Sequence, residues 1–415
     1  MPMAHDGARL RRTALAVLAT VFLLNLLARG SGETYAVFLL PMEREFGWSR
    51  SQLTSVYALY LVVGGLLAPL VGALFDRLGP RVVYTSGLCC LATAFLLAGT
   101  LQRLWEFYLY IGVVIGVGVA LNGMVPASAL LSRWYRERLS SAIGIAFAAM
   151  GCGALVFVPL AQGLLGHFDW RGTYRVLGYA LLAGVPLAAF AVPWKSYVAG
   201  NPQYRREARG PAGDGGATVA MALRTPLYWG LVAMFFFTSV GMYTVLPQSV
   251  VYFIDSGFSP LTAASAYGIT GMLSVASVSS SGLLAERFGY RQTVSVSFVG
   301  TALGIATLFA LSFAPHGALL FSLLAAYVLM FGLCMGVRGP IISSICTREF
   351  GGARVATIYG TLYSTNALGA AFGSLTGGVL HDLTGGYRAG FVFALCSIAL
   401  AALPMWVVRR LRGFK

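Results

Sequence analysis

The stretch Gly72-Ala-Leu-Phe-Asp76-Arg77-Leu-Gly79-Pro-Arg81 follows a long apolar run and decides the fold. Its pattern returns as Gly282-Leu-Leu-Ala-Glu286-Arg287-Phe-Gly289-Tyr-Arg291, a shift of 210 residues from position 72 to position 282. The same shift places Gly47-Trp48-Ser49 on Gly257-Phe258-Ser259. A repeat with constant spacing indicates that the chain consists of two copies of one unit, joined near the middle.

The composition indicates that the solvent of this chain is partly lipid. Of 415 residues, 58% are hydrophobic and 10% are charged, whereas soluble domains carry about 25% charged residues. The net charge of +15 would suit a nucleic-acid partner, but the basic residues form short clusters between apolar runs, which argues against nucleic acid. The cysteines show no C-x-x-C spacing and the histidines lie outside the apolar runs, so we expect no metal and no cofactor.

A helix that crosses a bilayer needs about 20 mostly apolar residues, and helices satisfy their own backbone hydrogen bonds in lipid. The sequence therefore predicts an all-α membrane protein with twelve transmembrane helices in two pseudo-symmetric six-helix halves. The halves are residues 1–194 and 226–415, joined by a polar, basic linker, 195–225, whose Gly and Pro content is typical of a flexible loop. The expected spans are 13–40, 51–74, 82–101, 106–132, 139–165, 174–193, 226–253, 262–284, 292–313, 317–345, 354–379 and 387–408.

Arginine and lysine counts predict the orientation of these spans, because such residues are enriched in cytoplasmic segments. If the N-terminus is cytoplasmic, the cytoplasmic segments hold 21 basic residues and the outer segments hold 6. We therefore expect a multi-pass protein with both termini in the cytoplasm. The compact length and short loops favour the inner membrane of a bacterium.

The repeated loop resembles the signature G-x-x-x-D-R-x-G-x-R of the major facilitator superfamily, found between the second and third helices. The resemblance implies a secondary transporter with two six-helix halves around a central cavity. A carboxylate at the end of the second helix can pair with nearby arginines or with a helix N-terminus, which suggests contacts that close the cytoplasmic side in one state. The alternative is that the basic residues only fix topology. The candidate gating residues are Asp76, Arg77, Arg81, Glu286, Arg287 and Arg291.

Apart from charges at the span ends, which are counted with the loops, Arg29, Glu33 and Arg338 are the charges inside the expected spans. A charge at the bilayer centre costs about 2.5–3.5 kcal/mol on insertion scales, so such residues face a cavity or a partner. Glu33 is one helical turn beyond Arg29, and Asn25 is one turn before it, which makes a polar stripe about 12 Å long. The alternative for Arg29 and Glu33 is an ion pair that only neutralises itself.

The repeat extends this polar lining to the second half. A shift of 210 residues sets Tyr243 against Glu33, and the alignment of Gly116 with Gly332 pairs Asn122 with Arg338. In the superfamily the first, fourth, seventh and tenth helices line the cavity, which implies that these side chains form one set. Arg338 has the alternative of extending to the cytoplasmic interface, and Tyr363 and Asn366 have that of an ordinary interhelical hydrogen bond. The candidate substrate-binding residues are Arg29, Asn122, Tyr243, Gln248, Arg338, Tyr363 and Asn366.

A closer resemblance comes from Arg133-Trp134-Tyr135-Arg136-Glu137-Arg138 and the small residues that follow it at helical spacing. It looks like the fifth-helix signature of the monocarboxylate transporter family, and the bacterial oxalate:formate antiporters are similar. Two departures matter. Gly30-Ser31-Gly32-Glu33 lacks the family's tryptophan, and the span 262–284 lacks the arginine that grips substrate in that family. The family's carboxylate site therefore cannot be carried over to this chain.

These residues favour a transporter of a small organic anion, driven by proton coupling or exchange. Arginine binds a carboxylate through two parallel hydrogen bonds, and Glu33 is the group placed to carry a proton, although pairing with Arg29 would lower its pKa. A drug or metabolite exporter is the main alternative, and two arginines in the cavity count against it.

A membrane receptor that uses the transporter fold is another alternative, and it would carry an attached signalling domain. An enzyme is not expected, since no Ser/His/Asp set or phosphate loop is present. The expected partners are the anionic substrate, a proton or counter-substrate, and the lipid bilayer, with the chain acting as a monomer.

Overall fold

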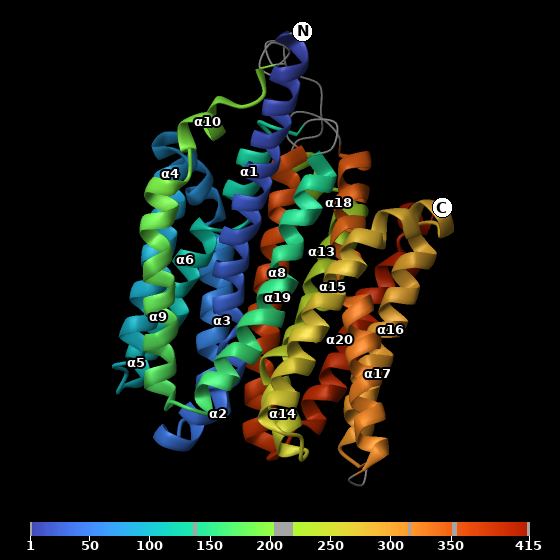
Figure 1. The fold of residues 1–415 in the computed structure, drawn as a ribbon. Coiled ribbons are helices and arrows are strands. Elements are labelled where there is room, and N and C mark those ends of the chain that lie inside the picture. The colour runs from blue at the N-terminus through green and yellow to red at the C-terminus, as the bar shows by residue number, and fades with distance from the viewer. Residues whose placement is uncertain (1, 136–138, 203–218, 314–316, 351–354, 413–415) are drawn as a thin grey trace. The chain divides into compact units, whose positions relative to one another are not determined.

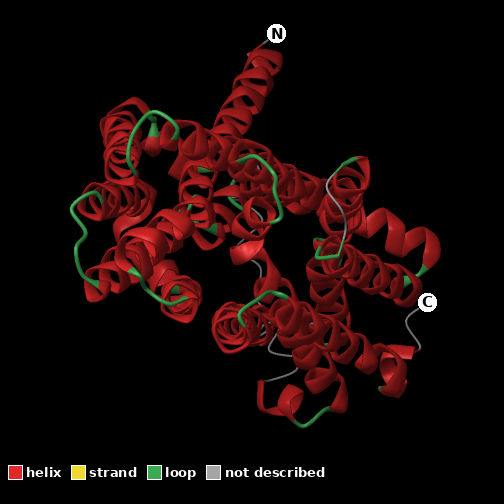
Figure 2. Cartoon of the chain, turned by 90° about the horizontal axis from the view of Figure 1, so that it is seen from below, coloured by secondary structure: helices red, strands yellow, loops and turns green. Residues whose placement is uncertain are grey.

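The computed structural model describes residues 2–135, 139–202, 219–313, 317–350 and 355–412. Every regular element in these ranges is a helix, and no strand occurs in them (Figure 2). The predicted all-α fold is therefore confirmed. Arg136, Glu137 and Arg138 of the fifth-helix signature, and residues 203–218 of the expected linker, lie outside the described residues.

The chain packs as two compact units that cut across the sequence repeat. The first unit comprises Met1–Thr34 with Leu66–Pro211, and the second comprises Tyr35–Gly65 with Ala212–Lys415. Thr34, at the first boundary, is a turn residue between two helices, and Leu67 is the turn residue just beyond the second boundary. The first two spans therefore change from one unit to the other where their helices are interrupted.

The first unit is built around two helix pairs. Helix α1 packs against α8, and at their contact Gly30 and Gly153 leave no space for a side chain, because a Cβ on either would collide with the opposing backbone. Helix α4 packs against α9 and α6. The elements are α1 (Pro2–Glu33), α4 (Ala68–Ala98), α5 (Leu104–Phe107), η1 (Tyr108–Ile115), α6 (Gly116–Leu121), α7 (Met124–Leu131), α8 (Leu139–Leu165), α9 (Trp170–Pro186), η2 (Leu187–Ala191) and α10 (Trp194–Ala199).

In the second unit, α13 packs against α19 and α20, and α17 packs against α15 and α16. Figure 1 shows α16 and α17 side by side. The elements are α2 (Tyr35–Phe46), α3 (Arg50–Leu66), α12 (Val219–Leu223), α13 (Pro226–Val245), η3 (Leu246–Gln248), α14 (Ser249–Asp255), α15 (Pro260–Phe288), α16 (Tyr290–Leu311), α17 (Ala318–Met335), α18 (Arg338–Glu349), α19 (Val355–Thr384), α20 (Arg388–Val407) and α21 (Arg409–Arg412).

Ten stretches of the described residues are long and apolar enough to cross a membrane, and each overlaps an expected span. The expected spans 51–74 and 354–379 are not among the ten. The first is interrupted at Leu67, so that it is divided between the 17-residue α3 and the start of α4. The second is the continuous 30-residue α19, which is rich in Gly, Ser and Thr.

The repeat seen in the sequence recurs in the backbone. Gly47 and Gly257 have φ of 64° and 97°, and Gly79 and Gly289 have φ of 77° and 83°. An L-residue with a side chain rarely adopts such angles, so glycine at these turns has the same steric reason in both copies. The positions separated by 210 residues also alternate between burial and exposure in nearly the same order from 71 to 80 and from 281 to 290.

Candidate functional site

The tenth span is interrupted in the interior of the second unit, between the end of α17 at Met335 and the start of α18 at Arg338. Neighbouring helices satisfy two of the backbone groups at the interruption. The Gly336 N–H donates to Ser277 Oγ of α15 at 3.0 Å, and Ser297 Oγ of α16 donates to the Cys334 carbonyl at 2.7 Å. Irregular backbone at membrane depth persists only where protein or a water-filled cavity provides partners for its N–H and C=O groups. The packing of the second unit therefore stabilises this interruption.

Arg338, the first residue of α18, has a buried side chain with few polar partners. It is 1% exposed, its Nη2 donates to the Met242 sulfur at 3.3 Å, and its Cζ lies 4.9 Å from the centre of the Phe298 ring. Its Nε and Nη1 have no hydrogen-bond partner among the described residues. A thioether is a weak acceptor and an aromatic face compensates only part of a cation's lost hydration. The charge of Arg338 is therefore poorly compensated within the described part of this unit.

Asn122 occupies the corresponding interruption of the fourth span, between α6 and α7 in the first unit. It is 0% exposed, and its Nδ2 donates to the Gly118 carbonyl at 3.0 Å. Its Oδ1 has no hydrogen-bond partner among the described residues. Gly87 of α4 lies directly against the amide, where a Cβ would collide with it. The sequence paired Asn122 with Arg338, and both lie where their spans are interrupted.

The polar stripe of α1 lies in the first unit, and α1 packs against both α6 and α7. Asn25 is 0% exposed; its Nδ2 donates to the Val21 carbonyl at 3.0 Å, and its Oδ1 has no partner among the described residues. Arg29 and Glu33 are half-buried, and each has an interaction partner. The first unit thus buries two amide oxygens with unused acceptor capacity.

The remaining candidates lie in the second unit and differ in their surroundings. Gln248 is buried at the break after α13, and its Oε1 has no partner among the described residues. Tyr243 is half-buried, with its ring 6.4 Å from that of Tyr57. Asn366 Nδ2 donates to Ser239 Oγ at 2.7 Å, an interhelical bond between α19 and α13. Tyr363 is 38% exposed.

The candidate gating residues lie on exposed helix ends in both copies of the motif. Asp76, Arg77, Glu286 and Arg287 are exposed. The two acidic residues make no ion pair or hydrogen bond with the residues that the structure describes. Three of the arginines lie against aromatic rings: Arg81 Cζ is 5.3 Å from the Phe190 ring, Arg287 Cζ is 5.5 Å from the Phe288 ring, and Arg291 Cζ is 3.9 Å from the Trp406 ring.

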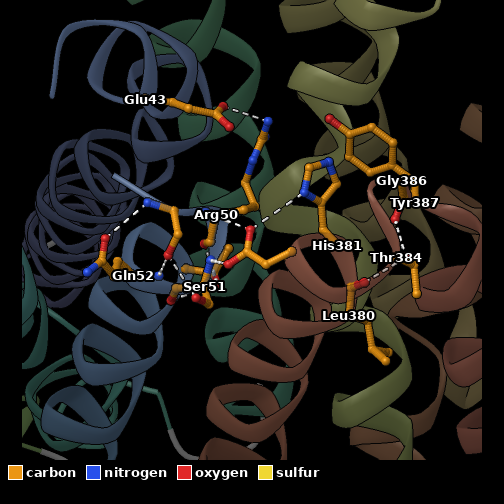
Figure 3. Close-up of polar contacts among 12 residues, drawn as sticks. Glu43, Arg50, Ser51, Gln52, Leu380, His381, Thr384, Gly386 and Tyr387 are labelled. Atoms are coloured by element: carbon orange, nitrogen blue, oxygen red, sulfur yellow. Dashed lines mark hydrogen bonds and ion pairs between the residues drawn. The ribbon is translucent and has the colours of Figure 1, made fainter. Parts of the chain in front are cut away.

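Sequence reasoning missed a second polar cluster, which joins α3 to α19 in the second unit (Figure 3). Asp382 of α19 accepts hydrogen bonds from the backbone N–H groups of Arg50, at 3.0 Å, and Ser51, at 2.8 Å. Arg50 Nη2 lies 2.6 Å from Glu43 Oε2 in an ion pair. The sequence does contain a signal for this helix start: Ser49 and Gln52 exchange hydrogen bonds as a capping box. Nothing in the spacing indicated that residue 382 would complete it.

Asp382 and His381 lie beyond residue 379, where the expected span ends, and their surroundings shift both pKa values. Burial alone would raise the pKa of Asp382, but hydrogen bonds from Ser51, from the Arg50 backbone and from Ser49 bring it below its ordinary value. Burial, and then the charge of Arg50, lower the pKa of His381. The cluster therefore favours an ionised Asp382 and a neutral His381.

The described residues contain no group of three or more His, Cys, Asp or Glu side chains placed to hold a metal ion. Among the candidate residues, Arg338 combines a buried charge with a position at an interrupted span.

Comparison with known proteins shows the family. A model of the Major Facilitator Superfamily matches residues 21–360 and 280–413. Monocarboxylate transporter 13 of Bos taurus is 26% identical over 379 residues, which cover 91% of this chain and 85% of the relative. Monocarboxylate transporter 3 of Rattus norvegicus is 26% identical over 393 residues, 94% of this chain and 79% of the relative. Monocarboxylate transporter 12 of Mus musculus is 24% identical over 426 aligned positions, 96% of this chain and 86% of the relative. The predicted resemblance is thus confirmed, and the chain belongs to the Major Facilitator Superfamily as a membrane transporter, not an enzyme.

Proposed function

We propose that this chain carries a small monocarboxylate across the cytoplasmic membrane by alternating access, with proton coupling or exchange. The observation that carries the proposal is the buried guanidinium of Arg338, whose Nε and Nη1 have no partner among the described residues. The similarity to proteins named monocarboxylate transporters supports the substrate class. The excess of basic residues in alternate loops supports placing both termini in the cytoplasm.

A carboxylate would supply hydrogen-bond acceptors for the two Arg338 nitrogens that have no partner among the described residues. The guanidinium presents a planar fork of donors that matches two carboxylate oxygens, and its two unused nitrogens provide such donors. Arg338 is also the first residue of α18, and a helix N-terminus favours a negative charge. Met242 and Phe298 provide apolar surface beside the guanidinium. This combination suits a short organic acid with one charge and an apolar body.

We propose further site residues in the first unit. Arg29 and Asn122 would contact the substrate, and Glu33 would exchange the coupling proton. Binding of an anion to Arg29 draws its charge away from Glu33, which raises the proton affinity of that carboxyl. In the second unit, Tyr243, Gln248, Tyr363 and Asn366 complete the proposed set of polar side chains, acting as hydrogen-bond partners.

We also propose that the halves 1–194 and 226–415 rock against each other around this lining, as expected for transporters built from repeats. The loop residues Asp76, Arg77, Arg81, Glu286, Arg287 and Arg291 would form their closing contacts in the conformation with the cytoplasmic side shut. Asp76 and Glu286 are exposed in the present structure.

Substitution of Arg338 by Met is expected to lower monocarboxylate uptake by between about tenfold and a hundredfold, because a charged hydrogen bond contributes about 1.5–3 kcal/mol. Initial uptake rates in proteoliposomes would be measured for mono-, di- and aromatic carboxylates, with organic cations as controls. Arg348→Met, an exposed position in the same helix, should leave uptake unchanged. Uptake of cations alone, with both variants equal to the parent, would favour a drug exporter.

Substitution of Glu33 by Gln is expected to abolish the stimulation of uptake by an inwardly directed proton gradient, since the amide cannot bind the coupling proton. Exchange of labelled for unlabelled substrate at equal pH should persist, because it needs no net proton movement. The two rates would be compared in the same proteoliposome preparation. Unaltered pH-driven uptake in Glu33→Gln would exclude Glu33 as the coupling residue.

Substitution of Asp76 by Asn is expected to reduce the maximal uptake rate severalfold with little change in the substrate concentration at half-maximal rate. The reason is that the carboxylate would act in the conformational change and not in substrate binding. Glu349→Gln removes an acidic group from another helix end, where it pairs with Arg410, and serves as control. Equal maximal rates in the parent and Asp76→Asn would show that the motif fixes topology only.

A further inference from the structure

The hairpin Tyr35–Gly65, formed by α2 and α3, belongs to the second unit although its flanking residues belong to the first. Its two ends are Thr34, a turn residue after α1, and the turn at Leu67 before α4. The corresponding helix of the second repeat, α13, is interrupted by η3 at Leu246–Gln248, close to the position that a shift of 210 residues predicts. Both repeats thus contain a half-helix that follows a break, and these two half-helices, α2 and α14, pack together.

Asp382 is the main polar anchor of this hairpin on α19. The first N–H groups of a helix have no partner within the helix. At the start of α3, the backbone N–H groups of Arg50 and Ser51 donate to Asp382 of α19. The backbone N–H of Gln52 donates to Ser49 Oγ. Further along the same contact, Ser374 Oγ donates to the Thr54 carbonyl at 3.1 Å, and Gly378 leaves room for the α3 backbone. One carboxylate from α19 therefore supplies the partners for two of the first donors of α3.

A group of ionisable side chains surrounds this anchor, and together they define the latch: Glu43 of α2, Arg50 of α3, Asp255 of α14, His381 and Asp382 of α19, and Tyr387. Figure 3 shows Glu43, Arg50, His381 and Tyr387 converging at the start of α3. Arg50 is ion-paired with Glu43 and its Cζ lies 5.9 Å from the Tyr387 ring, while Tyr387 donates to Asp255 at 2.6 Å.

His381 is the group in the latch that titrates nearest to neutrality. Its Nδ1 lies 3.8 Å from Asp382 Oδ1, and its ring centre lies 4.7 Å from that of Tyr387. A proton on this ring would be attracted by Asp382 and Glu43 and repelled by Arg50, in a partly buried setting. Burial and Arg50 outweigh the two carboxylates, so the pKa of His381 is lowered in the latched arrangement. When the hairpin is released into water, the ring regains an ordinary proton affinity.

We propose that these residues latch the hairpin Tyr35–Gly65 to the second unit, and that protonation of His381 releases it. Asp382 Oδ1, which lies 3.8 Å from His381 Nδ1, is the atom that accepts from the Arg50 N–H, so a protonated ring would compete with the start of α3 for this oxygen. The latch is therefore fully stable above the released-state pKa of His381, and its stability is lost as pH falls from that value toward the lower pKa of the latched state. Acidification at this end of α3, the outer end in the proposed orientation, would open the carrier on the acidic side. The inference rests on transport by alternating access and is independent of the substrate.

The test uses Ser374→Cys as a reporter, because Ser374 is 1% exposed beneath the hairpin and its thiol would react only after α3 separates from α19. The full-length variant in nanodiscs is labelled with a charged maleimide at pH 7.5 and pH 5.5. Each rate is divided by that of the same protein unfolded in detergent, because thiolate content falls with pH. The protein without Ser374→Cys gives the background from its native cysteines.

We expect normalised labelling to be at least about twofold faster at pH 5.5 than at pH 7.5, the range in which histidine titrates. His381→Gln in the reporter background should remove this ratio, and Asp382→Ala should give fast labelling at both pH values. Equal rates at the two pH values in the parent, or an unchanged ratio in His381→Gln, would overturn the pH switch. Slow labelling in Asp382→Ala would overturn the latch itself. The readout needs no substrate, so it is unaffected if the proposed substrate class is wrong.

Discussion

The proposed transport depends on one constraint: the buried positive charge of Arg338 lacks a full set of partners among the described residues. Removing a guanidinium from water is costly unless an anion or several acceptors replace the lost hydration. Arg338 has a thioether and an aromatic ring beside it, and the helix that it begins orients a positive dipole end in the same place. A carrier that binds an anion only transiently has a physical reason for such an arrangement, because a permanent counter-charge would compete with the substrate.

Interrupted helices occur in both units, and several candidate polar residues lie at the breaks. Asn122 and Arg338 lie at the breaks of the fourth and tenth spans, and Thr34 and η3 mark the breaks of the first and seventh. A continuous helix satisfies its own backbone and exposes no main-chain groups, whereas a break places polar groups and side chains at one depth. Ser277 and Ser297 satisfy the break beside Arg338 from neighbouring helices, so that its position is held by the surrounding unit.

The repeat and the charges were predictable from the sequence, because both depend on spacing and on the cost of a charge in lipid. The glycine pairs Gly79 and Gly289 adopt the same backbone conformation, and Arg338 is buried. The cluster around Asp382 was not predictable, since it joins residues more than 300 positions apart and each alone is an ordinary residue at a helix end. Residue type alone left Asn366 open as a cavity residue or as a partner in an interhelical hydrogen bond, and its amide donates to Ser239 in the helix contact. The sequence pattern identifies charged and polar residues that cost free energy in lipid, whereas the packing of the helices decides which residues they contact.

The most direct test of the central claim is equilibrium binding of a radiolabelled monocarboxylate, chosen as the best substrate of the uptake panel, to the purified full-length chain. Binding would be measured in detergent at fixed pH, where no gradient or transport contributes. If Arg338 binds the carboxylate, Arg338→Met is expected to raise the dissociation constant at least about tenfold, with Arg348→Met equal to the parent. Equal dissociation constants for the parent and Arg338→Met would contradict this role, and would leave Arg338 as a structural residue of the interrupted helix.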